Sequence, residues 1–235
     1  MPNHITNVLD VTGLRSERGR FLKKVYKKSK GEDCIDFNAT VPMPKELEDS
    51  NAPNCDKKLA RSFAQKYGAT DWYEWKCKNW GTKWGAYDAC PPAESDAVLR
   101  LRFNTAWCMG TAWTLKTSKL FPTLTFTTYW IDEGGGAGKS TIKNGAEDHE
   151  DMSDHDWRME FDESYREEYE GIVESPYGEF RQTYLIDQTE LDWYDFEKAV
   201  VERTLEEDLP LLVGLIPNFN SGEAKILAQN RLKGD

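Results

Sequence analysis

The sequence predicts an α+β protein in which an antiparallel sheet is covered by helices on one face, followed by an acidic, mainly helical C-terminal region. Three observations support this prediction. Some short segments alternate apolar and polar residues, which is typical of strands, and others repeat apolar residues every three or four positions, which is typical of helices. The two kinds of segment succeed each other along the chain. The balance of charge reverses after residue 146.

The first half of the chain is predicted to contain two strands and three helices. In the first helix, Phe21 and Val25 share a face and lysines cover the rest, and Gly31 is placed to end it. Asp71 can cap an aromatic helix that begins at Trp72. The predicted elements are a strand at 5–12, a helix at 15–29, a strand at 34–41 and helices at 57–67 and 72–80.

The second half continues the alternation and then becomes acidic and helical. Leu99, Leu101 and Phe103 alternate with Arg100 and Arg102, which predicts a strand with one buried face. A capping-box pattern begins the strongest helical segment of the chain, at residue 189. The predicted elements are strands at 98–103, 124–131, 138–143 and 180–186, and helices at 111–120, 156–173 and 189–209.

Charge divides the chain into two parts. Residues 1–146 hold 22 Lys and Arg against 16 Asp and Glu, whereas residues 147–208 hold 5 against 23. A mildly basic body therefore precedes a strongly acidic region, and we expect a domain boundary between them. The predicted domains are residues 1–146 and residues 147–235.

Composition excludes several classes of protein. The longest apolar run, residues 209–217, contains two prolines and is far shorter than the roughly 20 residues of a membrane span. The N-terminal residues are polar and do not resemble a secretion signal. The cysteines are odd in number and form no C-x-x-C pair, which indicates reduced thiols in a cytoplasm. They are Cys34, Cys55, Cys77, Cys90 and Cys108.

A series of short motifs resembles a known family. In order, they are PNHITNVLDVTG at the N-terminus, DFNATVPMP, WYEWKCKNWGTKWGAY, FNTAW and YWIDEGGGAGKSTIKNG. The series resembles a family of phage- and plasmid-borne proteins with a ferredoxin-like domain, typified by the plasmid protein YubB, and covers roughly residues 1–145. The resemblance implies a ferredoxin-like plait and carriage on a mobile element. It brings no catalytic residues, so none are assigned, and no cofactor is expected.

The string GGGAGKST, at residues 134–141, suggests a phosphate-binding loop at first sight. Such a loop requires G-x-x-x-x-G-K-[ST] followed by a helix, so that backbone amides surround the phosphates. The first glycine of the pattern is replaced by Glu133, and no apolar helical periodicity follows Ser140. We therefore expect a glycine-rich hairpin, and the nucleotide site is the weaker alternative.

An acidic segment at residues 147–156 contains His149 and His155 among carboxylates. The six-residue separation of the two histidines suits neither successive helical turns nor a calcium-binding loop, which favours a solvated linker over a divalent-metal site. The chain holds only three histidines, so a Cys-His or Ser-His hydrolase is difficult to assemble. The sequence therefore favours a non-enzymatic protein, and an enzyme would require a pocket that no motif indicates.

Two clusters can carry nucleic-acid binding. The tryptophans at 72, 75, 80 and 84 could stack on nucleobases, although their near-helical spacing is more typical of a core. The lysines of the first predicted helix could contact phosphates, although a solvated face is the more common role. As an alternative function we therefore consider a nucleic-acid-binding module that uses exposed aromatics together with Lys23, Lys24, Lys27 and Lys28.

The acidic region carries the preferred functional prediction. Aromatic residues are interleaved with its carboxylates, so the region can fold and present a negative surface to a basic partner. We predict a cytoplasmic phage or plasmid accessory protein that binds a basic host protein, in the sharpest form a counter-defence inhibitor that occludes a nucleic-acid-binding surface. The predicted contact residues are Asp162, Glu163, Glu167, Glu168 and Glu170.

Overall fold

The computed structural model of the chain describes residues 3–29, 31–173, 198, 201–202 and 222–233. Residues 1–157 form one unit and residues 158–235 a second. The strands are β1 (His4–Thr12), β2 (Tyr26–Ser29), β3 (Glu32–Ile35), β4 (Ala93–Glu94), β5 (Val98–Ala106), β6 (Thr125–Asp132), β7 (Ala137–Lys143) and β8 (Ala146–Met152). The helices are α1 (Arg15–Val25), η1 (Phe37–Ala39), α2 (Lys45–Glu48), α3 (Lys57–Tyr67), α4 (Trp72–Trp80), α5 (Thr111–Leu120), α6 (Asp154–Phe161), α7 (Glu163–Val173) and α11 (Gly222–Lys233).

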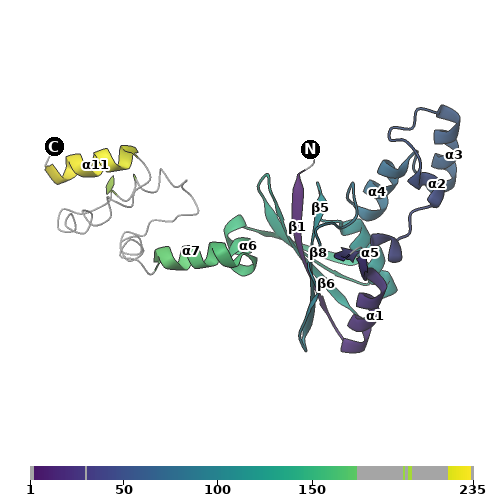
Figure 1. The fold of residues 1–235 in the computed structure, drawn as a ribbon, viewed down its shortest axis with the longest axis horizontal. Helices are drawn as coiled ribbons and strands as arrows, with labels where there is room; N and C mark the ends of the chain where they lie inside the picture. The colour runs from purple at the N-terminus through teal and green to yellow at the C-terminus, as the bar shows by residue number, and fades with distance from the viewer. Residues whose placement is uncertain (1–2, 30, 174–197, 199–200, 203–221, 234–235) are drawn as a thin grey trace. The chain divides into compact units, whose positions relative to one another are not determined.

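A six-stranded antiparallel sheet forms the centre of the first unit, in the order β4-β5-β1-β6-β7-β8 (Figure 1). Within it, β1, α1, β4, β5, α5 and β6 make a β-α-β-β-α-β unit whose strands lie in the order β6-β1-β5-β4. Each helix connects two parallel strands with an antiparallel strand between them, which is the ferredoxin-like arrangement. Strands β7 and β8 extend this plait beyond β6, and residues 26–92 are inserted between α1 and β4.

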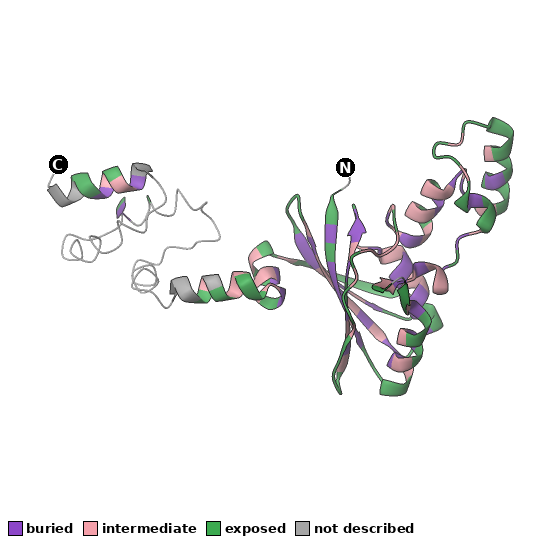
Figure 2. Ribbon diagram, in the orientation of Figure 1, coloured by how far each residue is buried: buried purple, intermediate pink, exposed green. Residues whose placement is uncertain are grey.

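The core lies between the sheet and the helices α1 and α5, which lie on one side of it (Figure 1). Along most of β5 and β6, buried residues alternate with more exposed ones, whereas nearly every residue of β8 is exposed. Figure 2 colours the chain by this burial. Phe21 of α1 packs edge-on against Phe126 of β6, with ring centroids 5.2 Å apart. Phe37 stacks on Trp113 of α5 at 4.1 Å with the rings nearly parallel. On the opposite side of the sheet, Arg100 forms two 2.7 Å hydrogen bonds with the carboxylate of Asp10 across the β1–β5 pair.

The fold confirms the predicted α+β class and differs from the sequence predictions at particular elements. Helices α3, α4 and α5 have the predicted bounds. The helix predicted at 15–29 was too long, since α1 ends at Val25 and the chain turns into the β2–β3 hairpin. The strand predicted at 34–41 ends at Ile35, after which the short helix η1 begins because the carboxylate of Asp36 accepts a hydrogen bond from the Asn38 amide.

The acidic segment does not leave the sheet where the charge changes. Residues 146–152 form β8, which pairs with β7 along its whole length, so the sheet continues past the predicted boundary after residue 146 and the first unit ends at Trp157. The predicted helix at 156–173 is two helices, α6 and α7. Asp162 separates them, because its carboxylate accepts a hydrogen bond from the Tyr165 amide and caps α7. The strand predicted at 180–186 lies outside the described residues, as does nearly all of the helix predicted at 189–209.

Candidate functional site

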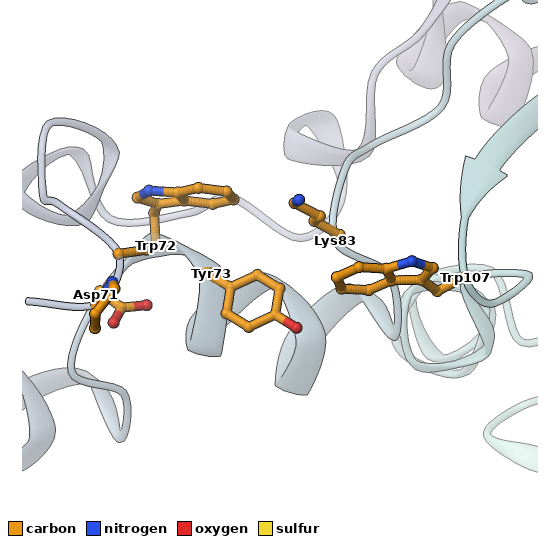
Figure 3. A pocket seen from close by; sticks show the side chains of 7 residues that line it. Asp71, Trp72, Tyr73, Lys83 and Trp107 are labelled. Atoms are coloured by element: carbon orange, nitrogen blue, oxygen red, sulfur yellow. The ribbon is translucent and has the colours of Figure 1, made fainter. Parts of the chain in front are cut away.

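Helix α4 presents aromatic side chains in two directions. Its first turn is fixed by Asp71, whose carboxylate accepts a hydrogen bond from the Glu74 amide at 2.9 Å. Trp75 and Trp80 then enter the core and are 6% and 3% exposed. Trp72 and Tyr73, in the first turn, are only partly buried and face a surface cavity (Figure 3).

A hydroxyl group joins the segment after α4 to the end of β5. The Thr82 hydroxyl donates to the Ala106 carbonyl oxygen at 2.7 Å and accepts from the Ala106 amide at 3.1 Å. Gly81, which ends α4 in a left-handed conformation, passes so close to α5 that a Cβ atom there would lie 3.1 Å from the Ala112 amide nitrogen. These contacts bring Lys83 next to the residue that follows β5, Trp107.

Trp107 has an unusual backbone and is exposed. Its φ is 70°, in the left-handed region that bulky side chains rarely adopt, and its amide donates to the Asn3 carbonyl oxygen at 3.0 Å. The residue keeps 42% of its surface exposed. Its indole meets the Tyr73 ring edge-on, with centroids 6.0 Å apart. An exposed tryptophan is therefore held in a strained conformation at the end of a strand, which is typical of functional positions.

The cavity has a volume of about 360 Å³ and combines aromatic walls with a cation. The Lys83 ammonium lies 4.9 Å from the centroid of the Trp107 ring and 5.1 Å from that of Trp84, within cation–π range of both. Figure 3 shows the lysine together with the three rings that border the cavity. The lining residues are Ala52, Pro53, Asp71, Trp72, Tyr73, Lys83 and Trp107.

The electrostatics of this cavity favour an anion over a cation. The cation in the lining is Lys83. Lys76 lies outside the lining, 5.1 Å from the centroids of both Trp72 and Trp80, and burial lowers its pKa. Asp71 is the acidic residue in the lining, but it is 5% exposed and its carboxylate is engaged in capping α4. Burial, followed by a hydrogen bond with the Cys77 side chain, raises the pKa of Tyr73.

The acidic residues predicted as a partner-binding surface lie on and just before α7. Glu163, Glu167 and Glu170 are exposed and spaced by four and three residues, which places them on one helical face. Asp162 is partly buried, caps the helix and lies 3.7 Å from Arg158. Glu168 lies on α7, but its side chain is outside the described part of the chain.

The four lysines of the alternative nucleic-acid surface do not lie on one helix. Lys23 and Lys24 are exposed in the last turn of α1. Lys27 and Lys28 lie instead on β2, where their ammonium groups approach Asp36 at 2.7 Å and Asp33 at 3.8 Å, respectively. Half of the predicted cationic surface is therefore neutralised by neighbouring carboxylates.

The glycine-rich string forms the turn and second strand of the β6–β7 hairpin, and a strand follows Ser140 where a phosphate loop would require a helix. Gly138 is opposite Trp130, and a Cβ at Gly138 would lie 2.8 Å from the indole. His149, on β8, lies over the Trp130 ring at 6.4 Å, and His155 lies on α6. No group of three His, Cys, Asp or Glu side chains within the described ranges is arranged to hold a metal ion.

The sequence interpretation identified part of the aromatic cavity. It singled out four tryptophans as either core or stacking residues: two are core residues, Trp72 lines the cavity and Trp84 flanks Lys83. It assigned no site role to Lys83, Tyr73 or Trp107. The sequence gives one indication of Trp107: this tryptophan lies between a predicted strand and Gly110, the residue before the predicted helix at 111–120.

The first unit is a ferredoxin-like α+β domain extended at one edge by two strands and interrupted by an insertion. A family described as the ferredoxin-like domain in Api92-like protein matches residues 79–187. The match supports the ferredoxin-like part of the resemblance drawn from the motifs, and it begins after β1, the strand at the centre of the sheet. No curated protein and no solved structure matches the chain. None of the described helices is both long and apolar enough to cross a membrane.

Proposed function

We propose that this chain is a non-enzymatic accessory protein of the YubB type, carried by a phage or plasmid, that binds a basic host protein in the cytoplasm through the acidic face of α7. The observation that carries the proposal is the line of exposed glutamates at 163, 167 and 170. The partner chemistry that fits this line is a lysine- or arginine-rich surface of the kind that handles nucleic acids. Occupying that surface would inhibit the host protein, which is the form that counter-defence would take.

Some of the charges on α7 work against the helix that carries them, whereas Glu163, in the first turn, favours it. Glu163 and Glu167 are four residues apart, Glu167 and Glu170 are three apart, and each like-charged pair costs a helix about 0.2–0.5 kcal/mol. Glu170 is in the last turn, which contains no basic residue, so it also opposes the helix dipole. A cationic partner would relieve both effects.

The test compares two full-length variants with the wild-type protein. In the first, Glu163, Glu167 and Glu170 become Gln; in the matched control, the exposed residues Glu32, Glu48 and Asp49 of the first unit become Gln, Gln and Asn. Each tagged protein is used to recover partners from nuclease-treated host lysate, and the recovered protein is then purified and titrated. We expect the α7 variant to lose at least about tenfold in affinity, with steeper salt dependence in the wild type, and the control to bind normally.

Stability separates this proposal from a loss of folding. Glutamine has nearly the same helix propensity as glutamate, so the α7 variant is expected to unfold at a urea concentration close to that of the wild type. Equal binding by the α7 variant and the wild type would refute the proposal. Recovery that disappears with nuclease would instead favour the nucleic-acid-binding alternative.

A further inference from the structure

We infer that the aromatic cavity beside α4 is a binding site for a nucleotide unit, with a nucleobase stacked among Trp72, Tyr73 and Trp107 and a phosphate at the Lys83 ammonium. All four side chains belong to the first unit and none belongs to α7, so the inference does not rest on the proposed function. The shared chemistry is a planar ring joined to a phosphate, whether in a free mononucleotide or in a single strand.

The cavity has the size and lining for this ligand. Its volume of about 360 Å³ is near the lower end of small-molecule sites, which suits a single nucleotide unit better than a larger ligand. Tryptophan and tyrosine rings accept any nucleobase, because every base offers a π face for stacking.

Charge decides between a nucleotide and the other ligand of aromatic cages, an organic cation. Lys83 lines the cavity and is already within cation–π distance of Trp107, so an indole that a cationic ligand would need already faces an ammonium group. The carboxylate in the lining, that of Asp71, is engaged at the start of α4. An incoming cation would be repelled, and a phosphate would be attracted.

The position of Trp107 is an independent indication of a ligand. A left-handed backbone at a bulky side chain is costly, and asparagine or glycine would adopt it with less strain. The strain is not offset by burial, because the side chain is 42% exposed. The backbone at this position is held by the Asn3 carbonyl oxygen, which accepts from the Trp107 amide, and by the Thr82 hydroxyl, which accepts from the amide of the preceding residue.

The test measures binding by the full-length protein of labelled decathymidylate, decauridylate and a DNA duplex by fluorescence anisotropy, and of AMP by calorimetry. The variants are Trp107→Asn and Lys83→Gln, and the matched control is K23Q/K24Q, which removes two exposed lysines from α1. We expect Trp107→Asn and Lys83→Gln each to weaken single-strand binding by about tenfold, and the control to change it less than about twofold.

Two further readouts make the result decisive. Because one lysine meets one phosphate, the logarithm of the affinity should fall with the logarithm of the salt concentration with a slope of roughly −0.7, and Lys83→Gln should abolish this slope. Trp107→Asn should unfold within a few degrees of the wild type, because relief of backbone strain offsets the lost ring contacts. Unfolding close to the wild type shows that the loss of affinity is not a loss of structure.

The outcomes discriminate between sources of the ligand and can overturn the inference. Comparable affinity for AMP and the oligonucleotides identifies a free nucleotide as sufficient, whereas binding of the single strands alone identifies a strand as the ligand. Absence of binding to all four probes contradicts the inference. So does preference for the duplex, or a control that loses as much affinity as the two cavity variants.

Discussion

Helix α4 carries two aromatic regions that differ in what surrounds them. Trp75 and Trp80 face the core, and the Trp80 indole N–H donates to the Val41 carbonyl oxygen at 2.9 Å. Trp72 and Tyr73 are only partly buried and line the cavity, and Trp72 also packs against the edge of the core. Within one nine-residue helix, aromatic side chains therefore either pack in the core or line a surface cavity, according to the side of the helix on which each lies.

The largest expected effect on stability comes from a substitution on the side of α4 that faces the core. Trp80 meets Phe37 and Trp75 edge-on and is 3% exposed, so Trp80→Ala should lower the free energy of unfolding by about 3–5 kcal/mol. Trp72→Ala, the matched change in the cavity region, should cost no more than about 1–2 kcal/mol because the ring is only partly buried. Urea unfolding followed by circular dichroism measures both. Equal losses would show that the two regions are not distinct.

An intermediate effect on stability is expected in the sheet, where Trp130 packs against Gly138 and leaves no room for a side chain there. Gly138→Val would drive methyl groups into the indole, and we expect a loss of about 1–3 kcal/mol. Lys139→Ala removes only a 3.1 Å ion pair with Glu150 at the surface and should cost less than about 1 kcal/mol. Thermal unfolding of both variants, with and without added ATP, is the measurement. If ATP raises the unfolding temperature and Lys139→Ala abolishes this increase, residues 134–141 bind nucleotide as a phosphate loop would.

The smallest expected effect is a pH dependence of the free energy of unfolding that is caused by Lys76, whose ammonium group lies near both Trp72 and Trp80. Burial lowers the pKa of Lys76 below its usual 10.5 in the folded protein. Between that lowered value and 10.5 the unfolded chain binds more protons, so the free energy of unfolding should rise with pH in this window. Lys76→Met should remove this contribution. The difference between wild-type and variant stability, followed by urea titration up to pH 10.5, isolates it from other groups, and a difference that is flat with pH would contradict the assignment.

The sequence predicted those elements whose ends are encoded locally. Helix α4 begins at an aspartate that caps it and ends at a glycine in the left-handed conformation, so both bounds could be predicted. Strand β8 was missed because its exposed residues show no apolar alternation, and it exists through pairing with β7. Its signal was the Asn144-Gly145 turn, where both residues have positive φ, as a two-residue hairpin requires.

The candidate site could be predicted only in part, for a physical reason. Trp72 and its neighbours stood out by composition, but the cavity also needs Lys83 and Trp107, which come from separate segments. The bonds between Thr82 and Ala106 that join these segments are tertiary contacts, and no periodicity records them. The acidic face of α7 could be predicted because helical spacing alone places its glutamates together.

The central position of β1 has a consequence for folding during synthesis on the ribosome. This strand is made before both of its neighbours, β5 and β6, which come from residues 98–106 and 125–132. At about 5–20 residues per second, β1 waits roughly five to twenty seconds for a partner. During that interval a strand with Val8, Leu9 and Val11 close together has two open edges. We expect the nascent chain to depend on chaperones that shield such a segment until β6 has emerged.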